Sequence, residues 1–262
     1  MFENKVVLVS GSGRGIGAAI ARHFATLGAD VVVNYFRNRQ PAEQTASSIR
    51  QMGRKALVVK ANMGELEDID RLFETIDREF HGLDIFIHNA ASGYNRPVMQ
   101  QRARGWDWTM NINARSLLFA AQRAVPLMEK RGAGVIVTIS SPGAGRVLPD
   151  YVVVGASKAA IEALTRYLAV ELAPKNIVVN AVSPGMVLTD ALQHFEMVRT
   201  DAHLAEKATD LTPAGRLVNP QDIANVVAFL CSPAASMIRG QVITVDGGAS
   251  LPAPGLEQPR GS

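Results

Sequence analysis

Short, almost continuously apolar runs alternate along the chain with longer segments of helical periodicity. The runs carry Val and Ile at consecutive positions, which is typical of strands buried on both faces of a sheet. They are Val6–Val9, Val31–Val33, Ala56–Val59, Leu83–Ile87, Val135–Ile139, Ile177–Val179 and Val242–Val245. Helical patterns lie between them near residues 15–28, 41–52, 65–80, 113–131, 151–173 and 220–231. Such repeated βα units predict an α/β fold, with a doubly wound parallel sheet of about seven strands and helices on both faces.

The chain is long enough for one large hydrophobic core, with 262 residues of which 47% are hydrophobic. No repeat or low-complexity stretch interrupts it, so we expect residues 1–251 to form a single domain. The segment 252–262 is rich in Pro and Gly and is expected to be a disordered tail. The single cysteine, Cys231, lies in an apolar helical run, where we expect a buried structural thiol.

Charge and hydropathy argue against several classes of partner. The formal net charge is only +3 and the basic residues are scattered among acids, so no nucleic-acid partner is expected. No stretch reaches the roughly 18 apolar residues of a membrane span, and no secretory signal is recognised. His81, His194 and His203 have no metal-ligand spacing with acids or Cys231, so no metal is expected. These observations predict a soluble, cytoplasmic protein.

The first predicted strand leads through a glycine-rich turn directly into the first predicted helix. The turn reads Gly11-Ser12-Gly13-Arg14-Gly15-Ile16-Gly17. Glycines there permit a tight turn, let backbone N–H groups approach a pyrophosphate, and let the helix pack closely on the strand. A glycine-rich loop alone is weak evidence and is also found in flexible loops. Its place between the first strand and the first helix predicts a dinucleotide site.

The end of the second predicted strand indicates which dinucleotide binds. A chain that selects NAD usually has an acid there to bind the ribose 2′-hydroxyl, whereas this chain has Asn34. Asn34 leaves room for a 2′-phosphate, and Arg14 and Arg37 supply positive charge on either side. We therefore expect NADPH as the cofactor. The alternative is that both arginines are ordinary surface residues.

Further segments resemble the short-chain dehydrogenase/reductase superfamily, over about residues 4–250. They are Asn62-Met63, Asn89-Ala90-Ala91, Asn113 within Met110–Ala114, and Ser183-Pro184-Gly185-Met186-Val187-Leu188-Thr189. The resemblance implies a Rossmann fold. It implies that residues 62 and 63 contact the adenine, residues 89–91 border the cofactor, and Pro184, Gly185, Val187 and Thr189 hold the nicotinamide carboxamide. It also implies that Asn113 supports the active-site helix and a proton-relay water.

The predicted active-site helix departs from the usual pattern of this superfamily. Most members carry Tyr-x-x-x-Lys, but the position that precedes Lys158 by four is Val154, which has no proton to donate. Tyr151 lies seven residues before Lys158, with Gly155 between them. This arrangement is similar to the enoyl-acyl-carrier-protein reductases, above all to the type III (FabL-type) enzymes. The likeness extends over Asn89–Gly93, Arg96–Met99, Trp106–Ala114, Ala159–Leu172, Thr212–Arg216 and Met237–Gln241.

The longer spacing has a chemical reason. Reduction of a 2-enoyl thioester delivers hydride to Cβ, whereas the negative charge develops on the thioester oxygen, three bonds away. Moving the tyrosine by three helix positions shifts it by about 4.5 Å relative to Lys158. We expect Tyr151 and Lys158 to share one helix face, with Tyr151 stabilising the enolate oxygen and Lys158 orienting the ribose. As a nearby cation, Lys158 is also expected to lower the pKa of Tyr151.

Ser141 leaves a second activity open. It lies seventeen residues before Lys158, where ketone-reducing members of the superfamily place a catalytic serine and many enoyl reductases place a second tyrosine. Its side chain either contacts substrate or bonds the backbone at the strand end. His88 ends the fourth predicted strand and is expected to be a structural residue.

The substrate side is expected to include Arg96 and a mobile lid over residues 190–211. Leu192, Phe195 and Met197 recur at near-helical spacing there and are candidates to contact an acyl chain, although they are equally compatible with a core helix. Trp106 and Trp108 have the same two interpretations.

The sequence therefore predicts an NADPH-dependent oxidoreductase that reduces the C=C bond of enoyl thioesters in fatty acid or related biosynthesis. The acyl group is expected on acyl-carrier protein or coenzyme A. One alternative is a 3-oxoacyl or other carbonyl reductase that uses Ser141, and another is a catalytically silent NADPH-binding sensor or scaffold, which Val154 suggests. The resemblance implies a homotetramer formed by the helices near 113–131 and 151–173.

Overall fold

A single parallel sheet forms the centre of the molecule in the computed structural model, which describes residues 1–187 and 204–252. The strand order is β3-β2-β1-β4-β5-β6-β7, and every neighbouring pair is parallel. The strands are β1 (Val6–Val9), β2 (Asp30–Tyr35), β3 (Ala56–Lys60), β4 (Ile85–His88), β5 (Gly134–Ile139), β6 (Ile177–Pro184) and β7 (Val242–Val245). The expected doubly wound α/β fold is thus confirmed.

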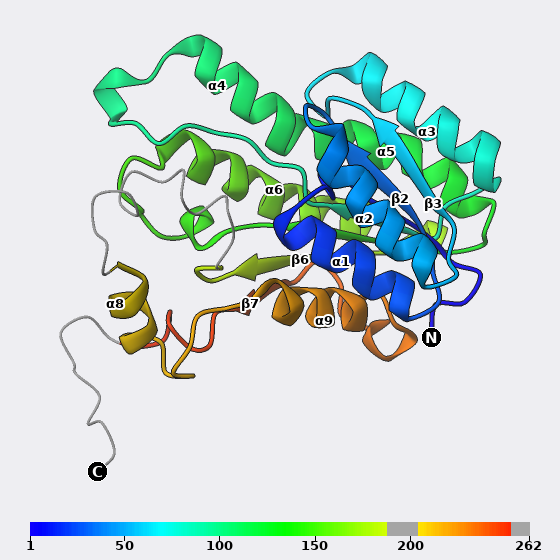
Figure 1. Ribbon diagram of the computed structural model, residues 1–262. Helices are drawn as coiled ribbons and strands as arrows, with labels where there is room; N and C mark the ends of the chain where they lie inside the picture. Colours follow the sequence, from blue (N-terminus) through cyan, green and yellow to red (C-terminus); the bar gives the residue numbers. More distant parts are fainter. Residues whose placement is uncertain (188–203, 253–262) are drawn as a thin grey trace.

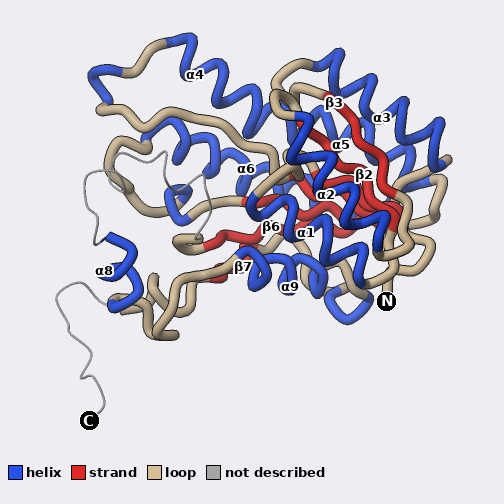
Figure 2. Tube along the Cα trace, in the orientation of Figure 1, coloured by secondary structure: helices blue, strands red, loops and turns tan. Residues whose placement is uncertain are grey.

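Helices cover both faces of this sheet (Figure 1, Figure 2). They are α1 (Gly15–Thr26), α2 (Arg39–Gln51), α3 (Leu66–Phe80), α4 (Ala103–Met110), α5 (Ser116–Glu129), α6 (Val152–Glu171), α8 (Leu204–Asp210) and α9 (Pro220–Leu230). A π-helical turn, Asn111–Arg115, joins α4 to α5. In Figure 1, α4 and α8 lie at the end of the molecule away from the N-terminus.

Two hydrophobic cores, one on each face, explain why the strands are apolar at most positions. Val7 and Val9 of β1 pack in a core with residues of α1, α2 and α9. Val6 and Leu8 of the same strand point the other way, into a core with residues of α3, α5 and α6. Because successive strand side chains alternate between faces, a strand covered on both sides is apolar at most positions on both faces.

Most predicted elements agree with the structure to within a few residues, but the active-site helix begins later than expected. The prediction placed Tyr151 inside this helix, whereas α6 begins at Val152 and Tyr151 occupies the N-cap position, with φ −101° and ψ 8°. Asp150 before it has a left-handed backbone, with φ 58°, which a right-handed helix does not permit. Tyr151 therefore lies at the junction between a loop and the helix.

Other elements were not predicted, or lie beyond the described residues. Helix α4 was not expected, and β6 continues to Pro184 rather than ending at Val179. Of the expected lid, only the part from residue 204 is described, and it contains α8. The expected tail lies outside the described residues from 253 onward. Among the described residues, no helix is both long enough and apolar enough to span a membrane.

Candidate active site

The carboxyl ends of β1 and β4 mark the place where ligands bind in open parallel sheets. The chain adds β2 and β3 on one side of β1 and then crosses to place β4 on the other side. The loops after β1 and β4 therefore diverge, and a crevice forms between them at this switch point. The glycine turn follows β1, and Asn89 follows β4.

The glycine turn has the backbone geometry that only glycine adopts easily. Gly11 and Gly15 have positive φ angles of 64° and 56°. A Cβ atom at Gly17 would lie 2.5 Å from Nδ2 of Asn89 and 2.6 Å from the carbonyl oxygen of Gly11. Helix α1 begins without a side-chain cap and with no acid in its first turn. This N-terminus fits a pyrophosphate, because its first N–H groups and the helix dipole both favour an anion.

Ser10 and Asn89 join the two loops of the crevice. Oγ of Ser10 accepts hydrogen bonds from the backbone N–H groups of Asn89 and Ala90, both at 3.0 Å. Nδ2 of Asn89 donates to the carbonyl oxygens of Ser10 and Gly11, at 2.9 and 3.1 Å. Ser10 was not predicted as a site residue, although a serine directly after an apolar strand can bond nearby backbone groups in this way.

Asn34 holds the glycine turn through a side-chain hydrogen bond. Its side chain is buried, and Oδ1 accepts a hydrogen bond from the backbone N–H of Gly11 at 3.0 Å. Nδ2 donates to the carbonyl oxygens of Val59 and Ala61, at 3.3 and 3.1 Å. The amide is thus engaged by backbone, and the positive charge beside this turn comes from the exposed side chains of Arg14 and Arg37.

Two further residues expected at the cofactor are also engaged within the protein. Oδ1 of Asn62 accepts a hydrogen bond from the N–H of Gly64 at 3.0 Å. Met63 is buried in the core beneath β1 and β2. Both residues therefore shape the end of β3 by turn formation and packing.

Lys158 reaches the end of β5 from the second turn of α6. Its ammonium group donates to the carbonyl oxygen of Ile139 at 2.7 Å and is buried. Burial lowers the pKa of Lys158 to about 8, and the charge of Glu162 acts in the opposite direction. Glu162 is itself held by Ser140, whose hydroxyl donates to Oε1 at 2.6 Å. The lysine is thus fixed at the strand end where a cofactor ribose is expected.

Tyr151 faces Ser141 across the entrance to α6. Its hydroxyl donates to Oγ of Ser141 at 3.3 Å. Burial raises the pKa of Tyr151, and the hydrogen bond to Ser141 opposes this rise in part. The expectation that Lys158 lowers this pKa is therefore wrong, because loss of hydration of the phenolate outweighs the neighbouring groups. Tyr151 is a neutral hydroxyl donor over a wide range of pH.

Two glycines make room for the Tyr151 ring. A Cβ atom at Gly143 would lie 2.5 Å from Cε1 of Tyr151, and one at Gly155 would lie 2.7 Å from the carbonyl oxygen of Gly143. These distances are shorter than van der Waals contact, so side chains at either position would displace the ring or the loop. Gly155 is thus explained by the close approach of α6 to the loop after β5.

Asn113 connects the loop after β4 to the active-site helix. It lies in the π-helical turn, and its Oδ1 accepts from the N–H of Ser92 at 2.8 Å. Its Nδ2 donates to the carbonyl oxygen of Ser92 and to Oγ of Ser157, both at 2.9 Å. Because Ser157 directly precedes Lys158, Asn113 positions the lysine through α6.

Val154 occupies the helix position where most short-chain reductases have tyrosine, and it does not face Ser141. It is 7% exposed and packs on Gly93, where an added Cβ would lie 2.2 Å from Cγ2 of Val154.

His88, at the end of β4, is buried, shares a 2.7 Å hydrogen bond with Ser116 and has its pKa lowered to about 3 by burial. It is therefore neutral, in agreement with a structural role.

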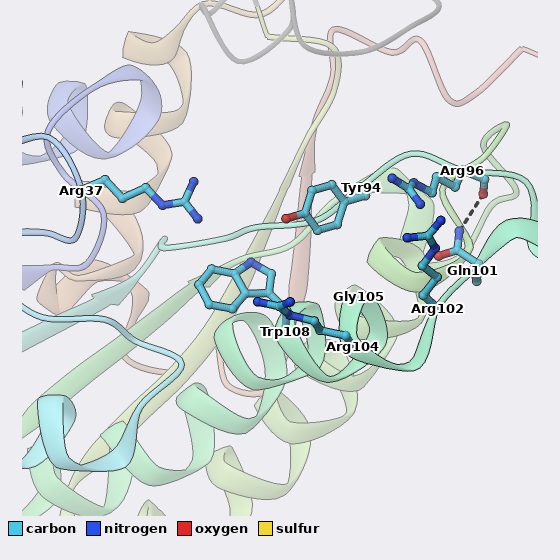
Figure 3. A pocket seen from close by; sticks show the side chains of 8 residues that line it. All are labelled: Arg37, Tyr94, Arg96, Gln101, Arg102, Arg104, Gly105 and Trp108. Atoms are coloured by element: carbon cyan, nitrogen blue, oxygen red, sulfur yellow. Dashed lines mark hydrogen bonds between the residues drawn. The ribbon is translucent and has the colours of Figure 1, made fainter.

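Some of the remaining predicted site residues are described by the structure, and others lie outside the described residues. Pro184 ends β6, Gly185 donates from its N–H to the carbonyl oxygen of Val245 at 2.8 Å, and Val187 is buried. Arg96 lies in the loop between β4 and α4 and lines a pocket (Figure 3). Thr189, Leu192, Phe195 and Met197 lie outside the described residues.

Nearly the whole chain is similar to known reductases. Residues 11–250 match the family model described as enoyl-(acyl carrier protein) reductase. A hydroxynaphthalene reductase-like protein, Arp2 of Metarhizium robertsii, is 37% identical over 95% of this chain and 96% of its own length. A 1-cyclohexenylcarbonyl-CoA reductase of Streptomyces collinus is 36% identical over 96% of this chain and 89% of its own length.

Solved structures with similar folds carry both kinds of nicotinamide cofactor. A 7α-hydroxysteroid dehydrogenase complexed with NADH and 7-oxo glycochenodeoxycholic acid is 36% identical, with a TM-score of 0.89 and 94% of each chain covered. A short-chain dehydrogenase of Burkholderia cenocepacia in complex with NADP is 32% identical, with a TM-score of 0.86. That comparison covers 95% of this chain and 98% of the other.

Proposed function

Because this chain belongs to the short-chain dehydrogenase/reductase superfamily of NAD(P)-dependent oxidoreductases, we propose that it is an NADPH-dependent reductase of 2-enoyl thioesters. Within the superfamily, we propose that it functions as a type III enoyl-acyl-carrier-protein reductase. The observation that carries the proposal is the contact between two hydroxyl groups at the entrance to α6. Among the described residues there, Tyr151 and Ser141 face each other, whereas residue 154 is a buried valine.

The residues of the crevice fit a dinucleotide. The turn from Gly11 to Gly17 and the uncapped N-terminus of α1 would hold the pyrophosphate, and Lys158 would bind the ribose beside the nicotinamide. The exposed guanidinium groups of Arg14 and Arg37, together with the lack of a carboxylate at residue 34, favour a 2′-phosphate and hence NADPH. When bound, NADPH supplies the hydride for the reduction.

Tyr151 would stabilise the charge that develops on the substrate. Its hydroxyl, kept protonated by burial, is suited to donate a hydrogen bond to the thioester oxygen as this oxygen gains enolate character. A neutral phenol in a buried site is a stronger stabiliser of an oxyanion than water would be, because it needs no reorganisation. Ser141 holds the phenol in this direction through the 3.3 Å contact.

The place of Tyr151 supports C=C reduction. The hydroxyl donor comes from the residue before α6 rather than from its first turn, which separates it from the Lys158 anchor by three additional residues. In conjugate reduction the reacting carbon and the charged oxygen are three bonds apart, so the donor and the cofactor anchor must also be farther apart. The similarity to a 1-cyclohexenylcarbonyl-CoA reductase is consistent with such a substrate.

A carbonyl reductase is the second candidate, favoured by the contact between Tyr151 and Ser141. A tyrosine and a serine that share one hydrogen bond can together bind a single carbonyl oxygen. The similarity to a hydroxynaphthalene reductase-like protein is consistent with this candidate.

Turnover of matched thioesters distinguishes the candidates. Crotonyl-CoA and acetoacetyl-CoA carry four-carbon acyl groups of nearly equal size and differ in the group to be reduced. With NADPH, we expect the kcat/KM for crotonyl-CoA to exceed that for acetoacetyl-CoA, with butyryl-CoA as the product identified by mass spectrometry. Turnover of acetoacetyl-CoA alone would replace the proposal by carbonyl reduction. NADPH binding without turnover of either thioester would favour a sensor or scaffold.

The proposal has three further parts. Residues 1–251 act as one NADPH-binding domain. The acyl group arrives on coenzyme A or acyl-carrier protein in the cytoplasm, as part of fatty acid or related biosynthesis. The assembly is a homotetramer, since α6 exposes large apolar side chains such as Tyr167 and Val170.

A further inference from the structure

A strongly basic pocket lies beside the candidate active site. Its volume is about 320 Å³, within the range of small-molecule sites. The residues that line it are Arg37, Tyr94, Arg96, Gln101, Arg102, Arg104, Gly105 and Trp108. Four of them are arginines and none is acidic, so the pocket has a strong positive potential. Figure 3 shows the guanidinium groups arranged around it, with Trp108 and Tyr94 between them.

None of these four arginines forms an ion pair with another residue in the described ranges. Elsewhere in those ranges arginines do pair with acids, as Arg39 does with Glu43 and Arg123 with Asp70. All four side chains are exposed, so water and salt screen part of their mutual repulsion, and a bound anion would relieve more of it. Four arginines with no acid among the lining residues therefore give the pocket a composition that favours an anion.

Aromatic rings and backbone contacts hold part of this cluster in place. The Arg37 guanidinium lies 5.7 Å from the ring of Trp108, and the Arg96 guanidinium lies 6.0 Å from the ring of Tyr94. Nε1 of Trp108 donates to Oγ of Ser92 at 2.9 Å. Nε2 of Gln101 donates to the backbone oxygen of Arg96 at 2.7 Å. These contacts already restrict the side chains, so less conformational entropy is lost when an anion binds.

The pocket is connected directly to the loop that carries Tyr151. The backbone N–H of Arg96 donates to the carbonyl oxygen of Asp150 at 2.8 Å, one residue before Tyr151. The same loop approaches α6 through the packing of Gly93 on Val154. A ligand that enters the active site past Tyr151 would therefore pass Tyr94 and Arg96.

A bound NADPH would place a phosphate at only one side of the pocket, beside Arg37. Arg37 follows β2, where a 2′-phosphate of NADPH would lie, whereas Arg96 and Arg102 come from the segment between β4 and α4, and Arg104 lies in the first turn of α4. These three arginines would therefore be free to bind a second phosphate. Both carriers considered for the acyl group, coenzyme A and acyl-carrier protein, attach it through a phosphopantetheine arm. We propose that this basic pocket binds the phosphate of the phosphopantetheine arm that carries the acyl group, through Arg96, Arg102 and Arg104.

This inference rests on the proposed function, because that function supplies the acyl group on a phosphopantetheine arm. Its test measures binding and needs no catalytic turnover. Pantetheine, 4′-phosphopantetheine and coenzyme A are titrated by calorimetry into protein saturated with NADP⁺, so that the 2′-phosphate site is already filled. We expect 4′-phosphopantetheine to bind at least about tenfold more tightly than pantetheine, because Arg–phosphate hydrogen bonds are charge-assisted. A lack of enoyl reduction would contradict the proposed function and leave this measurement unaffected.

A matched pair of variants assigns the effect to the pocket. The double variant Arg102→Ala/Arg104→Ala is expected to lose the tenfold advantage of the phosphate while its affinity for pantetheine stays unchanged. Arg71→Ala/Arg78→Ala removes the same charge from exposed residues of α3, a helix that lies apart from α4 in Figure 1, and is expected to keep the advantage. Unchanged binding of NADP⁺ shows that each variant is folded.

The relative affinities of the three compounds show whether the phosphate is bound and whether coenzyme A makes additional contacts. Equal affinity for 4′-phosphopantetheine and coenzyme A would support a site for the phosphate common to both carriers. Tighter binding of coenzyme A would support the same site with an additional contact to its adenosine part. Equal affinity for pantetheine and 4′-phosphopantetheine, no binding of any of the three, or a phosphate advantage that persists in Arg102→Ala/Arg104→Ala would overturn the proposal.

Discussion

Gly93 and Val154 lie so close together that a Cβ atom on residue 93 would be only 2.2 Å from Cγ2 of Val154. The loop after β4 therefore packs directly on the helix position that carries tyrosine in most of the superfamily. This contact and the position of Tyr151 before α6 are two parts of one arrangement: the loop takes the space of the usual tyrosine, and the donor moves to the helix entrance.

Val154→Tyr should not restore the common arrangement. The ring has no room beside Gly93, so overpacking should lower the free energy of unfolding by about 1–3 kcal/mol, as measured by urea denaturation. The double variant Tyr151→Phe/Val154→Tyr should stay inactive, and Val154→Ile should be affected less. Recovery of activity in the double variant would show that position 154 can serve as the donor site.

Gly143→Ala should impair catalysis by displacing the Tyr151 ring. The added Cβ would lie 2.5 Å from Cε1 of that ring, and a displacement on the order of 1 Å can cost about a hundredfold in rate. The matched control is Gly145→Ala, because a Cβ there has no neighbour within 4 Å. Steady-state kcat for crotonyl-CoA is the readout, and equal values for both variants would contradict the assigned ring position.

Lys158 should give the apo protein a characteristic dependence of stability on pH. Its pKa in the folded state is about 8, below the ordinary value of 10.5, so the unfolded chain binds more protons between these values. Stability should therefore rise with pH in this window, by about 2 kcal/mol between pH 8 and 10. Below pH 8 the cost of burying the charged ammonium is fully present.

The variant Lys158→Met isolates this contribution. The difference in unfolding free energy between wild type and Lys158→Met should shift in favour of wild type by that amount from pH 8 to 10. Tyr151 adds little in this range, because its pKa is raised above the ordinary value of 10 and it stays protonated. A difference that does not change with pH would mean that Lys158 is not the titrating group.

Arg37→Ala should weaken NADPH selectively. Loss of a guanidinium beside the 2′-phosphate should raise the KM for NADPH about tenfold and leave that for NADH nearly unchanged. Arg39→Ala is the neighbouring control, since Arg39 pairs with Glu43 instead. Equal effects on both cofactors, or better use of NADH by wild type, would contradict the assignment of Arg37.

The protein should sediment and scatter light as a tetramer. Tyr167 and Val170 are 68% and 75% exposed on α6, which leaves an apolar surface that a second subunit would cover. Val170→Glu should dissociate the assembly, whereas Met237→Glu, at an exposed residue outside α6, should not. A wild-type monomer would remove the basis of this prediction.

The fold could be read from the sequence because its signals are local and physical. Consecutive apolar residues such as those from Val6 to Val9 are required by a sheet with a core on each face, and the glycines from Gly11 to Gly17 are required by the turn into α1. The spacing of Tyr151 and Lys158 was visible in the same way. These features need no knowledge of which distant residues meet.

The missed features depend on distant contacts or on single backbone angles. The start of α6 is set by the left-handed φ of Asp150, which its sequence does not require. The engagement of Asn34 with Gly11 and Ala61 appears only when three segments are brought together. The pKa of Tyr151 depends on burial, so the charge of Lys158 alone gave the wrong direction. Arg102 and Arg104 have no periodicity that marks them, and only the structure shows that they line one pocket with Arg37 and Arg96.

The central claim is that Tyr151 is the hydroxyl donor for reduction of an enoyl thioester. The most direct test is the kcat/KM of Tyr151→Phe with crotonyl-CoA and NADPH, alongside its dissociation constant for NADPH. Loss of the hydroxyl should lower kcat/KM by about 10² to 10⁴, while NADPH binding stays within about twofold of wild type. Crotonyl-CoA reduction at the wild-type rate by Tyr151→Phe, with NADPH bound normally, would contradict the account.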